Sequence, residues 1–101
     1  MANKTPSVLF VCVHNAGKSQ MAAALMRAKA GDKVTVLSGG TNYGDNLNRE
    51  AQLAVAELGV SMDGEYPKGV TDDVFMSVDR IVILGNEAKL APRAGMAGTI
   101  E

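Results

Sequence analysis

The only cysteine of the chain, Cys12, begins the segment CVHNAGKS at residues 12–19, which lies between an apolar run and a strongly helical one. A loop that leads into a helix directs several unpaired backbone N–H groups at one point, and the helix dipole adds partial positive charge there. Such a point binds an anion, and the same field stabilises a thiolate. We therefore predict that Cys12 is a nucleophile in a loop that binds an oxyanion.

The other residues of this segment have types that suit the same chemistry. Lys18 supplies positive charge, and Gly17 has access to backbone angles that other residues avoid. Ser19 is expected to cap the helix or to donate its hydroxyl to the thiolate, and Asn15 to brace the loop through side-chain hydrogen bonds. The predicted catalytic residues are Cys12, Lys18 and Ser19, and the predicted oxyanion site consists of Val13, His14, Asn15, Ala16, Gly17, Lys18 and Ser19.

Other interpretations of the segment are open. A lone cysteine at a strand end is most often a buried apolar residue, and a lone loop histidine is most often solvated. The run GKS at 17–19 is also the end of a nucleotide-binding loop, Gly-x4-Gly-Lys-Ser/Thr. However, Cys12 stands where that motif has its first glycine, and Gly85 stands where an aspartate would organise magnesium. A nucleotide hydrolase is therefore disfavoured, and no metal site is predicted.

Strand and helix patterns alternate along the chain. This alternation predicts an α/β fold with a three-layer architecture, in which a four-stranded parallel sheet with right-handed crossovers is flanked by helices. Ligands of such sheets bind beyond the carboxyl ends of the strands, and Cys12 follows the first strand. The predicted strands are residues 7–11, 33–37, 80–84 and the start of a fourth at 96–100, and the predicted helices are 19–30, 48–58 and a short one capped by 71–73.

Two of the helices carry apolar residues at helical spacing. Glycines at 31 and 59 are expected to end them. The stripe on each helix is predicted to face the core, and the second helix is expected to cover the sheet. The stripe residues are Met21, Leu25 and Ala28 in the first helix and Ala51, Val55 and Leu58 in the second.

Composition excludes several classes of partner. The 101 residues are 47% hydrophobic, which is enough for one domain, 1–101, with a modest core. Ten basic and eleven acidic residues give a net charge of −1, so neither nucleic acid nor an anionic membrane is expected as a partner. The N-terminal apolar run is far shorter than the ~20 residues of a membrane helix. A single cysteine also suits a reducing compartment, and we expect a cytoplasmic protein.

The motif Val-Cys-x-x-Asn-x-x-Lys-Ser-Gln-Met-Ala resembles the low-molecular-weight tyrosine phosphatase and arsenate reductase superfamily, whose members use Cys-x5-Arg-Ser. SGGT at 38–41 resembles the Ser-Ala-Gly-Thr of that family, and ELGV at 57–60, PKG at 67–69 and VDRIVILG at 78–85 extend the resemblance over nearly the whole chain. It implies a flavodoxin-like, low-molecular-weight phosphatase architecture. Within the superfamily, FVCV, KSQMAAAL and VDRIVILG together are most similar to the actinobacterial arsenate reductases that depend on mycothiol.

The resemblance to that branch implies an arsenate reductase-like thiol transferase, an arsenate-mycothiol transferase with a role in arsenical resistance. Arsenate or phosphate would occupy the loop, with no tightly bound cofactor. Thioredoxin-coupled relatives carry two further cysteines, where this chain has Gly85 and Ala91-Pro92. An oxidised or arsenylated Cys12 must therefore be relieved by an external thiol, with mycothiol and a glutaredoxin-like mycoredoxin as the expected partners.

The chain departs from the family pattern in two places. Lys18 stands at the family arginine, which keeps the charge but loses a pair of parallel hydrogen bonds. The acid loop and C-terminal helix of the family fold would follow Glu101, and Asp72, Asp73 and Glu87 do not match the position of the family acid. A tyrosine phosphatase or small phosphomonoesterase, and a non-catalytic oxyanion-binding homologue, remain as alternatives. An uncovered part of the sheet would favour a homodimer or an unstable monomer.

Overall fold

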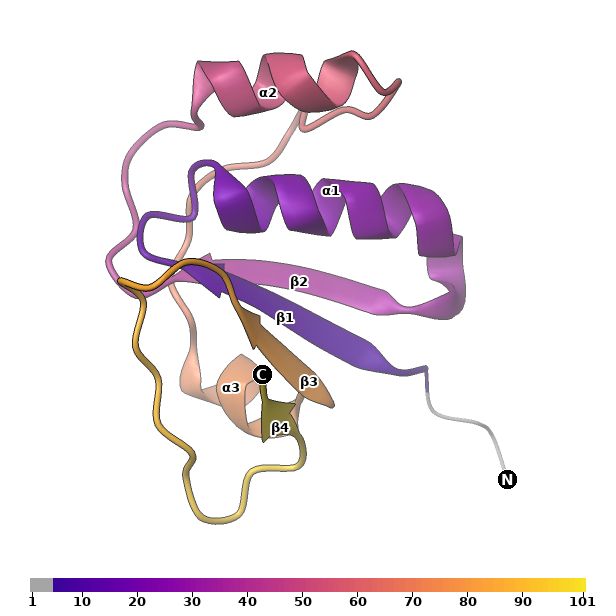
Figure 1. Ribbon diagram of the computed structural model, residues 1–101. Coiled ribbons are helices and arrows are strands. Elements are labelled where there is room, and N and C mark those ends of the chain that lie inside the picture. Colours follow the sequence, from indigo (N-terminus) through magenta and orange to yellow (C-terminus); the bar gives the residue numbers. More distant parts are fainter. Residues whose placement is uncertain (1–4) are drawn as a thin grey trace.

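The computed structural model describes residues 5–101 and contains a single parallel sheet (Figure 1). The strand order is β2-β1-β3-β4, so the first strand is central and each connection crosses over a face of the sheet. The predicted α/β fold with four parallel strands is confirmed. The strands are β1 (Ser7–Cys12), β2 (Thr35–Gly40), β3 (Arg80–Ile83) and β4 (Thr99–Ile100).

Helices lie on both faces of the sheet. α1 packs directly on one face, α2 packs on the outer side of α1, and α3 lies on the opposite face (Figure 1). None of the helices among residues 5–101 has the length and hydrophobicity that a membrane crossing needs. The helices are α1 (Lys18–Ala30), continued by a 3-10 turn η1 (Gly31–Lys33), then α2 (Arg49–Ala56) and α3 (Asp72–Ser77).

The prediction that the second helix covers the sheet is wrong. Ala51 and Val55 of α2 are buried against Ala24 of α1 and against Met62, in a cluster that contains no strand residue. Leu58 lies beyond the end of α2 and is 70% exposed. Because α1 already occupies this face of β1 and β2, the apolar stripe of α2 packs on the outer side of α1.

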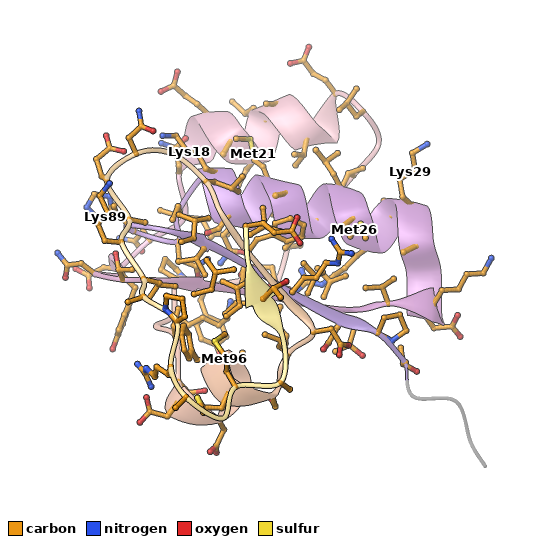
Figure 2. All side chains as sticks on the ribbon, turned by 60° about the horizontal axis from the view of Figure 1, so that its bottom comes forward. Lys18, Met21, Met26, Lys29, Lys89 and Met96 are labelled. Atoms are coloured by element: carbon orange, nitrogen blue, oxygen red, sulfur yellow. The ribbon has the colours of Figure 1, made fainter. Side chains whose placement is uncertain are left out.

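The buried face of α1 also differs from the predicted one. Leu25 and Ala28 are exposed, and Met21 contacts α2 instead of the sheet. Met26, which is labelled with Met21 in Figure 2, is the methionine that packs on the sheet side. The fully buried residues of α1 are small or polar, and they lie toward the sheet, the loop before α1 or α2. They are Ser19, Gln20, Ala23 and Ala24.

Several predicted ends of helices are confirmed. Gly31 has φ 60°, and its N–H bonds to the carbonyl of Arg27. Asn48 caps α2 by accepting a hydrogen bond from the N–H of Ala51 at 2.8 Å. Thr71 caps α3 in the same way. These are local signals, in which a side chain or a left-handed glycine satisfies backbone groups at a helix end.

The central strand β1 is buried on both faces, as its apolar sequence predicts. Leu9 and Val11 belong to the cluster on the α3 side, and Val8 belongs to the cluster on the α1 side. β2 starts two residues later than predicted and continues to Gly40, because its last three residues pair with residues 10–12 of β1. The expected fourth strand is shorter than the predicted 96–100.

Candidate active site

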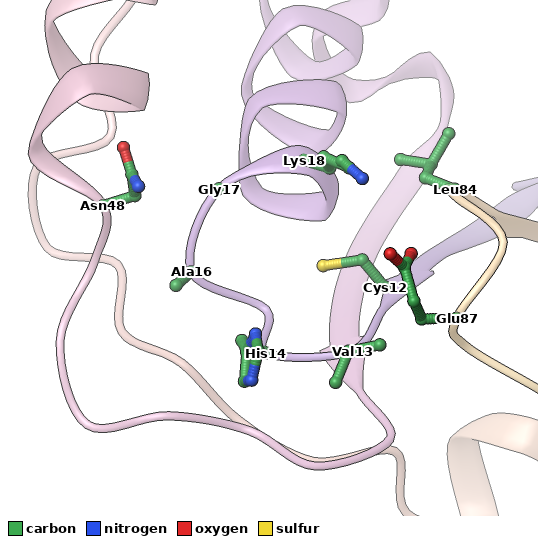
Figure 3. Close-up of a pocket in the computed structure, with 9 residues that line it drawn as sticks. All are labelled: Cys12, Val13, His14, Ala16, Gly17, Lys18, Asn48, Leu84 and Glu87. Carbon is green, nitrogen blue, oxygen red and sulfur yellow. The ribbon is translucent and has the colours of Figure 1, made fainter.

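Cys12 is the last residue of β1, and the loop that follows it leads into α1. The thiol therefore lies at the carboxyl edge of a parallel sheet, as the sequence predicted. A cavity of about 370 Å³ opens above it (Figure 3). Its lining residues are Cys12, Val13, His14, Ala16, Gly17, Lys18, Asn48, Leu84 and Glu87.

The sulfur of Cys12 has two hydrogen-bond partners. The residue is buried, with 7% of its surface exposed. The N–H of Asn15 donates to Sγ at 3.3 Å, and the hydroxyl of Ser19 lies 2.9 Å from it. The side-chain amide of Asn15 donates to that same hydroxyl oxygen at 2.7 Å. Since the Ser19 oxygen already accepts one bond, its single proton is available to the sulfur. The Ser19 hydroxyl is therefore placed to donate to the Cys12 sulfur.

Asn15 holds the loop in place from within. It is fully buried, and its Oδ1 accepts hydrogen bonds from Nε2 of Gln20 at 3.0 Å and from the N–H of Lys68 at 2.9 Å. Its φ is +53°, the left-handed region that asparagine tolerates better than most residues. The sequence assigned unusual backbone angles to Gly17, and its φ of −131° and ψ of −82° lie outside the helical and extended regions. The bracing role predicted for Asn15 is present, and Asn15 also provides the left-handed turn.

The end of β2 supports the loop from the other side. A Cβ on Gly40 would lie 2.5 Å from the carbonyl oxygen of Val13 and 3.0 Å from the amide nitrogen of Asn15. The N–H of Thr41 bonds to the carbonyl of Cys12 at 3.0 Å. Only a glycine allows this approach of two backbones. Gly40 is therefore a structural requirement of the loop.

Gln20 is a second buried support that sequence reasoning did not find. Its Nε2 donates to Asn15 and also to the carbonyl oxygen of Tyr66 at 2.9 Å. The helical pattern gave no signal for it, because Gln20 was expected outside the apolar stripe. Its burial connects the loop to residues 65–70, which run along the edge of β2 near the Gly40–Gly69 bridge.

The predicted site residues divide into two groups. Five of the seven predicted oxyanion-site residues line the cavity together with Cys12, whereas Asn15 and Ser19 are fully buried behind it and contact the sulfur. Ser19 makes no capping bond at the start of α1, so of the two roles predicted for it the structure supports the contact with the sulfur. Sequence reasoning missed Asn48, Leu84 and Glu87 in the lining. Asn48 had a detectable signal as the start of a helix, and the other two follow β3.

Lys18 reaches from the first turn of α1 toward the loop after β3. Its Nζ is 3.1 Å from the position that a Cβ on Gly85 would occupy. The ammonium group therefore lies at one side of the cavity, where Figure 3 shows it extending toward Leu84. Residues 5–101 contain no group of three or more His, Cys, Asp or Glu side chains that could hold a metal ion.

Lys68 lies outside the Cys12 cavity, and its backbone N–H bonds to the side chain of Asn15. Partial burial lowers the pKa of Lys68 below the ordinary lysine value of 10.5, and the nearby carboxylate of Glu65 opposes this shift. The Nζ of Lys68 is 3.6 Å from Glu65 and 3.5 Å from the hydroxyl of Ser38. The ion pair with Glu65 therefore offsets only part of the lowering of the Lys68 pKa by burial.

A cysteine that ends the first strand of a parallel sheet, followed by a loop curled toward its sulfur, defines a class of oxyanion-binding α/β proteins. The family model described as low molecular weight phosphotyrosine protein phosphatase matches residues 7–98. The chain belongs to this family. The resemblance found in the sequence is thereby confirmed at the level of the family.

Individual relatives in this family are arsenate reductases. A Halobacterium salinarum protein named "Putative arsenate reductase" is 34% identical over 89 residues, which cover 83% of this chain and 63% of the relative. Arsenate reductase 1 of Staphylococcus epidermidis is 30% identical over 88 residues, covering 87% and 64%. The Corynebacterium glutamicum thioredoxin-dependent arsenate reductase has a similar solved structure, with a TM-score of 0.85 and 34% identity over 100% of this chain and 51% of that one. The chain spans less than two thirds of the length of these proteins.

Proposed function

We propose that this chain is an arsenate reductase-like thiol transferase. The observation that carries the proposal is the environment of the Cys12 sulfur, which accepts a hydrogen bond from the N–H of Asn15 and lies 2.9 Å from the hydroxyl oxygen of Ser19, beside an open cavity. In the proposed reaction the loop amides and Lys18 bind arsenate, and the Cys12 thiolate acts as the nucleophile. When the Cys12 sulfur bonds to arsenic, one arsenate oxygen leaves as water. The external thiol then takes the arsenic and releases the Cys12 thiolate. A further external thiol attacks the sulfur of that adduct, which gives a disulfide and arsenite, so the two thiols supply the two electrons. The arsenate reductases among the relatives support this reaction class.

The need for an external thiol follows from the cysteine content. Cys12 is the only cysteine in the sequence, so no second thiol of this chain can form a disulfide with it. We propose a small thiol, mycothiol, as co-substrate and a glutaredoxin-like mycoredoxin as the protein that regenerates it. Both would place the reaction in the reducing cytoplasm.

The test is arsenate turnover with mycothiol and a mycoredoxin, compared with turnover with thioredoxin and its reductase. We expect activity with the first system. Cys12→Ser should remove it, and a melting curve like that of the wild type would establish that the variant is folded. Full activity of Cys12→Ser would reject the mechanism. Equal turnover with thioredoxin would reject the proposed reductant while leaving the reaction class intact.

A phosphatase acting on tyrosine phosphate or small phosphomonoesters is the second candidate, supported by the family to which the chain belongs. Lys18 offers a point charge in place of the planar fork of the family arginine. We therefore predict that Lys18→Arg raises turnover of a phenyl phosphate ester. The measurement is the release of the phenol at saturating substrate, and an unchanged rate would refute this reasoning.

A non-catalytic oxyanion-binding protein is the third candidate. It predicts that arsenate or phosphate raises the melting temperature without any turnover. Phe10 and Val82 on the α1 side of the sheet are only partly buried, which supports a proposed homodimer or an unstable monomer. A sharply melting monomer in sizing experiments would contradict that assembly.

A further inference from the structure

Glu87 is the one carboxylate among the residues that line the Cys12 cavity. It belongs to the loop after β3, and Figure 3 shows its carboxylate directed to the same side of the cavity as the Lys18 ammonium. A negative charge in a cavity that is to hold an anion opposes binding. Its presence there therefore calls for a functional explanation.

The charged atoms of Glu87 and Lys18 lie on either side of Gly85. The position that a Cβ on Gly85 would occupy is 3.1 Å from Nζ of Lys18 and 3.3 Å from Oε1 of Glu87. Both charged atoms thus lie around a point that the glycine leaves empty. Gly85 also has φ +87°, a conformation that favours glycine.

The two charges are close but not locked together. The four ion pairs found within 4.0 Å among residues 5–101 involve other side chains. Glu87 is also exposed, so solvent weakens its attraction for Lys18. An arriving anion can therefore compete with Glu87 for the ammonium group. The titratable side chains that line the cavity are Cys12, His14, Lys18 and Glu87.

We propose that Glu87 limits the affinity of the Cys12 cavity for oxyanions. It attracts Lys18 while the cavity is empty and repels the anion once it is bound, so that oxyanions bind more weakly and leave more readily. Glu87 acts through charge at a distance and needs no contact with the reacting atoms. This inference rests on the proposed function only in requiring that the cavity binds an oxyanion.

The experiment measures how inorganic phosphate protects Cys12 against alkylation by iodoacetamide, at constant ionic strength. The phosphate concentration that halves the alkylation rate gives the dissociation constant. We expect Glu87→Gln to lower this constant by about two- to fivefold, the range of an exposed charge pair. Glu87→Ala should change it in the same direction. At 1 M salt the difference should nearly vanish, because charges are then screened over about 3 Å.

Glu57→Gln is the matched control, because it removes one charge from an exposed residue at the end of α2, outside the cavity lining. It should leave the dissociation constant unchanged. An equal effect of both glutamine variants, or no effect of Glu87→Gln while phosphate protects the wild type, would overturn the role of Glu87. If phosphate and arsenate fail to protect the wild-type thiol at all, the proposed oxyanion site itself is wrong.

Discussion

Replacing Asn15 by alanine is the most informative perturbation of the loop. The substitution removes the donor to Ser19 and the acceptor of two bonds, one from the side chain of Gln20 and one from the N–H of Lys68. It also forces alanine to adopt φ +53°, a left-handed conformation that asparagine tolerates better. Each of these effects destabilises the folded state.

The magnitude can be estimated from these contacts. A buried donor that loses its acceptor costs about 1–3 kcal/mol, and two donors are affected, although Gln20 keeps its bond to Tyr66. Alanine in the left-handed region adds roughly 1 kcal/mol. We therefore expect Asn15→Ala to lower the free energy of unfolding by about 4 kcal/mol. That is a large part of the ~5–15 kcal/mol typical of a domain.

Urea unfolding followed by circular dichroism measures this loss. With a slope of about 1.5 kcal/mol per M, the midpoint should fall by about 2.5 M. Asn15→Gly is the control, since it loses the same side-chain bonds but accepts the positive φ, and it should be about 1 kcal/mol more stable than Asn15→Ala. A loss below about 1 kcal/mol for Asn15→Ala would refute the bracing role. Equal stability of the two variants would refute the backbone argument alone.

Three further outcomes are expected. Ser19→Ala should slow alkylation of Cys12 at pH 7 by about tenfold or more, because a hydrogen bond to a charged acceptor contributes about 1.5–3 kcal/mol, and an unchanged rate would mean that the hydroxyl does not stabilise the thiolate. Gly40→Ala should destabilise the fold by more than about 2 kcal/mol in urea unfolding, since its Cβ would lie 2.5 Å from the carbonyl oxygen of Val13; a neutral effect would contradict that packing. The pKa of Lys68 is lowered in the folded state, so the unfolded chain binds more protons between that lowered value and 10.5. The stability of the wild type relative to Lys68→Gln should therefore rise with pH through this window, and a flat difference would count against the burial of Lys68.

Much of the site was predictable because its signals are local. The strand, the loop and the first helix turn follow one another within residues 7–19, so the position of Cys12 at the carboxyl end of a strand follows from the order of the elements. The ends of helices were equally local, as at Gly31 and Asn48. In each case the groups that interact are within a few residues of one another, and their types alone indicate the structure.

The features that the sequence did not predict join distant parts of the chain. Gln20 donates to the carbonyl oxygen of Tyr66 across 46 residues, and the N–H of Lys68 donates to Asn15 across 53 residues. Glu87 reaches the cavity because β3 pairs beside β1, which brings the loop after β3 next to Lys18. No periodic pattern encodes such contacts.

By itself, the sequence determined the class of fold, the order of its elements and the loop in which a cysteine meets a helix start. Only the tertiary structure decided which face of α1 is buried, that α2 packs on α1, and which residues hold and surround the sulfur. The physical reason is that apolar periodicity and caps depend on neighbours along the chain. Burial of a polar side chain such as Gln20 depends on partners that folding alone brings together.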